Sequence, residues 1–292
     1  MIAFLVTATV LGISGLISNG FIVIVMITQW TKCRRLASSE QLLLSLGLSN
    51  LWATISLSLF HFSFSAESDV NSLNFQIWYS FFFFCITFRY WLTALLCFFY
   101  CIKIVNCSHA FFLWCKLRIS WLIPRLLVGS LIISLLAFIV TLSTRHTPSQ
   151  ESPTANATTV TQRKSLKDTF KRFDVFFPAL VSGCPFLVVL LCSILVVASL
   201  CGHVCQMTSK DSHLRSFQTK AHIQAAWTVL SLLLLFLSFF VAQVIMMTTR
   251  LGFNEELFIS AILVIYSPAQ AVLLVLNNPK LKQALAVMVQ RK

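Results

Sequence analysis

The 292-residue chain contains 58% hydrophobic and only 11% charged residues, too few charges to cover the surface of a soluble globule of this size. Its net charge of +13 sits in short segments between apolar runs, so we expect no nucleic-acid partner. These runs have the length of helices rather than of alternating barrel strands, and they predict an all-α protein with the lipid bilayer as its solvent.

Seven apolar segments predict a bundle of seven membrane-spanning helices in a single domain over residues 1–292. Each segment is long enough, or nearly so, to cross a hydrocarbon core that takes roughly 20 helical residues. The predicted spans are about 2–30, 41–64, 77–104, 126–142, 175–200, 225–247 and 257–276. A long polar loop (143–174) follows the fourth span, and a tail (277–292) follows the seventh.

The distribution of charge predicts the orientation of the chain. The segments assigned to the inner side hold fourteen Lys and Arg residues against two acidic ones, whereas the outer segments hold seven of each. Because cytoplasmic loops carry an excess of Lys and Arg, we expect the N-terminus outside and the C-terminus inside a plasma membrane. Asn156, in the pattern Asn-Ala-Thr of the long outer loop, is then a candidate glycosylation site.

Arg89 is the only formal charge well inside a predicted span. Such a charge is costly unless it faces protein, water or a partner, so Arg89 either contacts a ligand or is satisfied by neighbouring backbone and hydroxyl groups. Phe82 and Ile86 share its helical stripe towards the outer end and are candidates for lining a cavity. Gln243 and Ser260, in the outer halves of spans six and seven, either orient a ligand or bond across helices.

Two prolines and the C-terminal segment predict where helices bend and how the chain ends. Pro185 and Pro268 interrupt spans five and seven and are predicted bend points. Residues 281–292 have apolar residues at 281, 285, 288 and 289 with polar and basic residues between them, which predicts a short amphipathic helix on the inner leaflet.

No catalytic or metal-binding constellation is evident in the sequence. All ten cysteines fall in predicted spans or inner segments without metal-ligand spacing, so we expect free thiols, no metal and no cofactor. An enzyme is therefore not expected. A small transporter is an alternative, but no Asp or Glu lies in the middle of a span and seven segments do not form equal repeats.

Eight short motifs occur along the chain in a fixed order. They are NGFI (19–22), LLLSLGLSN (42–50), FYCIKI (99–104), FFLWCKLRIS (111–120), PF (185–186), SLCGHVCQM (199–207), TKAHIQA (219–225) and NPKLKQ (278–283). Together they resemble the type 2 taste receptors, the bitter receptors, a family of G-protein-coupled receptors. The resemblance covers all but the fourth span and the outer loops. A vomeronasal type 1 pheromone receptor, a distant relative, is the alternative within receptors.

This resemblance implies that small, often apolar bitter molecules bind in a cavity opening outward between spans three, five, six and seven. It implies coupling to a heterotrimeric G protein of the gustducin or inhibitory class through Tyr100, Lys103, His203 and Lys280. For Lys103, an ordinary interfacial lysine is the alternative interpretation, and for His203 it is a local cap or hydrogen bond.

Four positions depart from the pattern of that family and indicate a divergent member. Asn50 stands where the family usually has Arg, and Gln270 where it usually has His. Phe82 and Ile86 stand where Trp and Asn are frequent in the ligand pockets of the family. We therefore expect a more apolar pocket than is usual.

Overall fold

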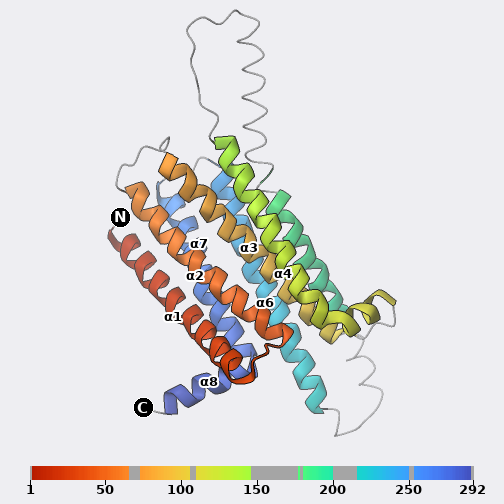
Figure 1. Cartoon of the computed structure of the whole chain (residues 1–292). Coiled ribbons are helices and arrows are strands. Elements are labelled where there is room, and N and C mark those ends of the chain that lie inside the picture. Colours follow the sequence, from red (N-terminus) through yellow and green to blue (C-terminus); the bar gives the residue numbers. More distant parts are fainter. Residues whose placement is uncertain are drawn as a thin grey trace, which may run out of the picture.

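The computed structural model describes residues 2–65, 73–105, 110–145, 177, 180–199, 216–249 and 253–290, and all regular elements in these ranges are helices. They are α1 (Ile2–Cys33), α2 (Ser38–Ser65), α3 (Leu73–Ile104), α4 (Ala110–Arg145), a helix over Leu180–Ser199, α6 (Ser216–Thr248), α7 (Phe253–Asn277) and α8 (Pro279–Gln290). The seven long helices stand side by side, and the short α8 extends outward at the lower end of the bundle (Figure 1). The predicted all-α seven-helix bundle is confirmed.

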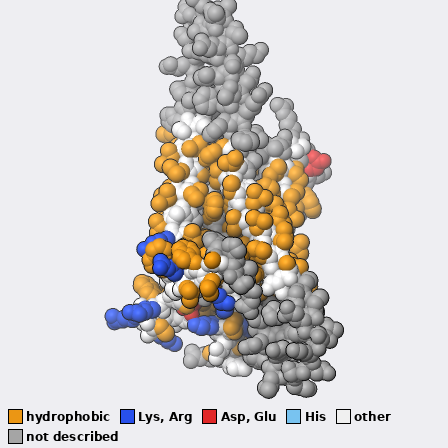
Figure 2. All heavy atoms as spheres, turned by 90° about the vertical axis from the view of Figure 1, so that its right-hand side faces the viewer, with side chains coloured by type: hydrophobic (Ala, Val, Ile, Leu, Met, Phe, Trp, Pro, Cys, Tyr) orange, Lys and Arg blue, Asp and Glu red, His pale blue; other side chains and the backbone are white. Residues whose placement is uncertain are grey.

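The exterior of the bundle is apolar. Large side chains on its outward faces, such as Ile17, Leu136 and Leu234, are more than half exposed. Figure 2 shows hydrophobic side chains spread over the middle of the molecule and Lys and Arg side chains gathered towards its lower end. Six helices in the described part of the chain are long and apolar enough to cross a membrane. An apolar belt of this extent indicates a multi-pass membrane protein.

α2 is not among these six helices because it is rich in polar residues, with eight serines in its sequence. Ser49, Asn50, Thr54 and Ser56 are all buried, and α2 packs against α1, α3, α4 and α7. Its polar groups therefore face other helices rather than lipid, which allows it to serve as a span of the bundle.

Local hydrogen bonds explain where α1 ends and α2 begins. Arg34 has a φ of 52° and donates its N–H to Trp30 O at 2.8 Å, the geometry of a left-handed C-terminal cap. At the start of α2, the Glu40 carboxylate accepts the Ala37 N–H at 2.9 Å, which is half of a capping box.

The motif NPKLKQ encodes the junction between α7 and α8. The side-chain oxygen of Asn278 accepts the N–H groups of Lys280 at 3.0 Å and Leu281 at 3.3 Å, so Asn278 caps the new helix. Pro279 follows at the first helical position, where its missing N–H costs nothing. The helix predicted for the C-terminal segment is thus confirmed, beginning at Pro279.

α4 begins well before the predicted span. The sequence predicted membrane entry near residue 126, but the helix starts at Ala110 and includes the basic segment before it. Arg125 lies with its guanidinium carbon 3.4 Å from the ring centroid of Trp121, one turn away. Such pairs stabilise a helix that continues beyond the apolar core of a membrane. There, a run of apolar residues no longer predicts the helix.

Candidate functional site

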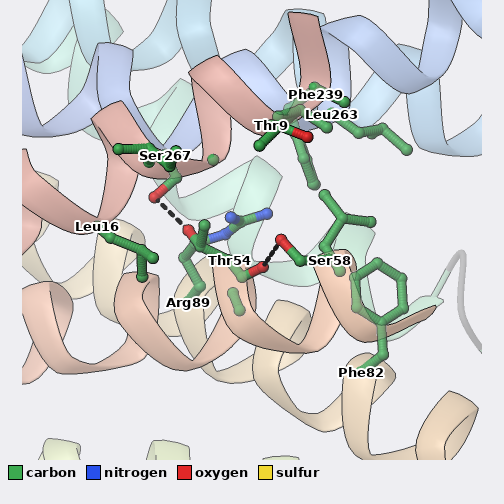
Figure 3. A pocket seen from close by; sticks show the side chains of 15 residues that line it. Thr9, Leu16, Thr54, Ser58, Phe82, Arg89, Phe239, Leu263 and Ser267 are labelled. Atoms are coloured by element: carbon green, nitrogen blue, oxygen red, sulfur yellow. Dashed lines mark hydrogen bonds between the residues drawn. The ribbon is translucent and has the colours of Figure 1, made fainter. Parts of the chain in front are cut away.

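A cavity of about 400 Å³ lies inside the bundle among α1, α2, α3, α6 and α7. Its walls are mostly apolar, with Phe82 of α3 and Leu263 of α7 among them, and they include the hydroxyls of Thr54 and Ser58 of α2 (Figure 3). Arg89 supplies its single charge. The volume and the few convergent polar groups are those of a small-molecule site.

This position differs from the cavity predicted between spans three, five, six and seven. No described residue of the Leu180–Ser199 helix belongs to the lining. Instead, Phe186 of that helix stacks on Phe236 and Phe240 of α6, with ring centroids 6.0 and 5.2 Å apart. Aromatic packing thus joins that helix to α6, while small residues of α1 and α2, such as Gly12 and Ala53, border the cavity.

The structure brings together two of the five residues predicted to contact a ligand. Phe82 and Arg89 both line the cavity. Ile86 is 3% exposed and belongs to the apolar core, whereas Gln243 is buried and accepts a hydrogen bond from the Tyr90 hydroxyl. Ser260 is also buried outside the lining. Ligand contact by these last three residues stays a prediction.

Arg89 meets aromatic rings rather than acidic groups. The side chain is 3% exposed, and its guanidinium carbon lies 4.4 Å from the ring centroids of both Phe239 in α6 and Tyr266 in α7. Within the described part of the chain, its buried Nε has no hydrogen-bond partner. Cation–π attraction offsets part of the cost of burying the charge and joins α3 to α6 and α7.

A network of buried amides and hydroxyls lies beside the cavity. Asn50 donates its amide N–H groups to Asn19 Oδ1 and Gln270 Oε1, both at 3.0 Å. Asn19 in turn donates to Ser267 Oγ at 3.1 Å, and Gln270 donates to Thr93 Oγ1 at 3.0 Å. The network therefore links α1, α2, α3 and α7 through neutral side chains.

Asn50 and Gln270, two of the positions that depart from the pattern of the resembled family, are thus direct partners. The sequence marked each of them separately but gave no reason to join them. Asn19 and Thr93 were missed as functional candidates, although both are polar residues within predicted spans, which is a signal of interhelical bonding. Gly15 lies close to α7 beside this network, where a Cβ would be in van der Waals contact with Pro268 Cδ at 3.4 Å.

Three of the four predicted coupling residues lie near one end of the bundle. Lys103 is exposed in the last turn of α3, and Tyr100 is partly buried with its ring 5.9 Å from that of Phe99. Lys280 of α8 forms an ion pair with Glu40 of α2. His203 and the predicted glycosylation site Asn156 lie outside the described residues.

Seven membrane helices around a ligand-sized interior cavity define the class of seven-transmembrane receptors. A sequence model of the taste receptor protein family (TAS2R) matches residues 1–292. The chain therefore belongs to the taste receptor type 2 family and is a G-protein-coupled bitter taste receptor, not an enzyme.

Individual relatives cover nearly the whole chain. Taste receptor type 2 member 9 of Papio hamadryas is 29% identical over 282 residues, covering 94% of this chain and 89% of the relative. Member 4 of Pongo pygmaeus is 30% identical over 288 residues, with coverages of 95% and 93%. Member 2 of Homo sapiens is 28% identical over 279 residues, with coverages of 93% and 90%. The predicted family is confirmed, at an identity that fits a divergent member.

The Asn50–Gln270 contact is expected to appear as an energetic coupling. Asn50→Leu leaves two buried acceptors without their donor, so it should destabilise the receptor. Gln270→Leu should lower the free energy of unfolding less in the Asn50→Leu variant than in the native receptor. We expect a coupling free energy of about 0.5–1.5 kcal/mol in a double-mutant cycle of unfolding in lipid–detergent micelles.

Asn277→Leu is the matched control for this cycle, because the Asn277 amide donates within its own helix, to Leu273 O. The changes that Asn277→Leu and Asn50→Leu cause in the free energy of unfolding should add up in the double variant. Additive free energies for Asn50→Leu and Gln270→Leu would contradict the contact.

The Glu40–Lys280 pair should make stability depend on pH. Burial alone would raise the pKa of Glu40, but hydrogen bonds from Lys280 and the Ala37 N–H, with the charge of Lys280, hold it below the usual 4.5. A lowered pKa stabilises the fold above pH 4.5, and this contribution is lost as the pH falls through the folded-state value.

The melting temperatures of the native receptor and of Glu40→Gln, measured between neutral and acidic pH, test this. The native protein should melt higher near neutrality, and the difference should shrink below pH 4.5. A difference that stays constant over this range would show that the ion pair does not stabilise the receptor.

Proposed function

We propose that small organic agonists bind in the cavity among α1, α2, α3, α6 and α7 and that Phe82 and Arg89 contact them. The observation that carries this proposal is the cavity itself, whose volume of about 400 Å³ suits a small molecule. Its largely apolar walls would take up the body of the ligand. Thr54, Ser58 and Arg89 offer the polar contacts that orient it.

The receptor would lie in the plasma membrane with its N-terminus outside. The cavity is lined by Ala8 and Thr9 of the first turns of α1, so it belongs to the half of the bundle near the N-terminus. The Lys and Arg side chains gather at the opposite end, which is the arrangement expected for a cytoplasmic face (Figure 2). An agonist would then enter from the outer side, where glycosylation of Asn156 would also occur.

At the inner end, Tyr100, Lys103, His203 and Lys280 would contact a heterotrimeric G protein of the gustducin or inhibitory class. Agonists with higher affinity for the conformation that binds the G protein would shift the population towards it. Pro185 and Pro268 each remove a backbone hydrogen bond from a helix and provide points at which it can bend.

Filling the cavity should abolish the agonist response. Gly12 lines the cavity, so Gly12→Leu places an isobutyl group in the space that the ligand would occupy. We expect agonist potency to fall at least about tenfold in a calcium-release assay with a promiscuous G protein and a panel of bitter compounds. Gly129→Leu on α4 is the control, because nothing lies within 4 Å of a Cβ there. Unchanged potency in Gly12→Leu, at equal surface expression, would place the agonist elsewhere.

Removing the exposed charge of Lys103 should weaken coupling without affecting ligand binding. Lys103→Ala is expected to reduce the maximal calcium response severalfold, because an exposed lysine at an interface contributes to electrostatic attraction of a partner. Lys32→Ala, in the last turn of α1, is the matched control and should behave as the native receptor. Equal responses from both variants would identify Lys103 as an ordinary interfacial lysine.

A further inference from the structure

Arg89 carries its charge at the middle of the bundle. α3 runs from Leu73 to Ile104, so at 1.5 Å per residue Arg89 lies about 20 Å or more from either end of the helix. None of the nine Asp and Glu residues in the sequence lies in the middle of a span. Glu40, the acidic group buried in the described part of the chain, already pairs with Lys280 at the inner end. The protein therefore places a cation deep in the membrane without an anion to balance it.

The neighbours of Arg89 leave its hydrogen-bonding capacity unused. The faces of Phe239 and Tyr266, each 4.4 Å away, attract the positive charge but offer no conventional acceptor for five N–H donors. Among the residues that the structure describes, none accepts a hydrogen bond from the guanidinium, and Nε is buried and unpaired. Figure 3 shows the guanidinium nitrogens directed into the space between the labelled lining residues.

The hydroxyl groups of α2 that line the cavity do not direct their protons into it as hydrogen-bond donors. Thr54 Oγ1 donates to Asn50 O at 2.8 Å, and Ser58 Oγ donates to Thr54 O at 2.9 Å. Thr54 Oγ1 also lies 3.0 Å from Ser267 Oγ of α7, so the single proton of each hydroxyl is taken up within the protein. Arg89 is left as the charged donor facing the cavity, and most of the remaining wall is apolar.

We propose that the cavity selects organic anions, namely small molecules with an apolar body and a carboxylate or sulfonate that pairs with Arg89. The inference rests on the proposed function of the cavity as the agonist site and narrows its ligand class. Two anionic oxygens accept N–H groups of the guanidinium side by side and neutralise its charge where water does not screen it. The apolar body occupies the space beside Phe82 and Leu263.

Matched pairs of ligands that differ only in charge test the proposal on the complete receptor in phosphatidylcholine nanodiscs. The probes are naphthoate with naphthamide, and phenylbutyrate with its amide, compared by competition against radiolabelled naphthoate. We expect each acid to bind roughly 10- to 100-fold more tightly than its amide. Arg89→Gln should remove that preference by weakening the acids, whereas Arg125→Gln, an exposed arginine on α4, should leave it intact.

Equal or tighter binding of the amides would overturn the proposal, as would an acid preference that survives in Arg89→Gln. If both members of a pair bind equally and Gly12→Leu abolishes both, the cavity is still the ligand site and only the anion selectivity is wrong. If no probe binds saturably, the anion inference is wrong. If Arg89→Gln fails to fold, two results still test the proposal. The native receptor should bind the acids more tightly than the amides, and Gly12→Leu should lose that binding.

Discussion

The two hydrogen bonds donated by the Asn50 amide hold the interior of this receptor together. Helices in lipid gain no hydrophobic free energy by associating, so close packing and interhelical hydrogen bonds must position them. Asn50 joins α2 to Asn19 of α1 and to Gln270 of α7, and Gln270 extends the chain of bonds to Thr93 of α3. All four side chains are neutral. The network therefore adds no further buried charge, and no further free-energy cost of burying one, near Arg89.

The network and the cavity share structural parts, so the shape of one depends on the other. Thr54 and Ser267 line the cavity and also bond to each other at 3.0 Å, and Ser267 accepts a further bond from Asn19. Thr93, at the far end of the network, donates to the backbone carbonyl of Arg89 at 2.9 Å. The residue that carries the charge of the cavity is therefore held, through its own helix, by the bonds that fix α1, α2 and α7.

The sequence predicted the features that are local and left open those that depend on the order of helices in the bundle. Long apolar runs indicated the spans, and a lone Arg89 within one of them marked a site, because each signal is contained in a few turns. A span predicted from about residue 126 does not reveal that α4 begins at Ala110, because a helix continues beyond the lipid where apolar content falls. The contact of Asn50 with Gln270 joins residues 220 positions apart, and an apolar residue such as Ile13 looks the same whether it faces lipid or a cavity. Only the packed bundle distinguishes these cases.

α6 is attached to the bundle differently from α1, α2 and α7. In the described part of the chain it meets α3 through the adjacent residues Arg89 and Tyr90: Arg89 lies over the Phe239 ring, and Tyr90 packs 4.7 Å from the Phe236 ring and donates a hydrogen bond to Gln243. Cation–π attraction weakens when an anion neutralises the cation, whereas amide hydrogen bonds do not respond to that charge. In the proposed complex, an anion paired with Arg89 would weaken its contacts with both Phe239 of α6 and Tyr266 of α7. The amide network would still bond α7 to α2, so we expect α6 to be the helix whose position changes most.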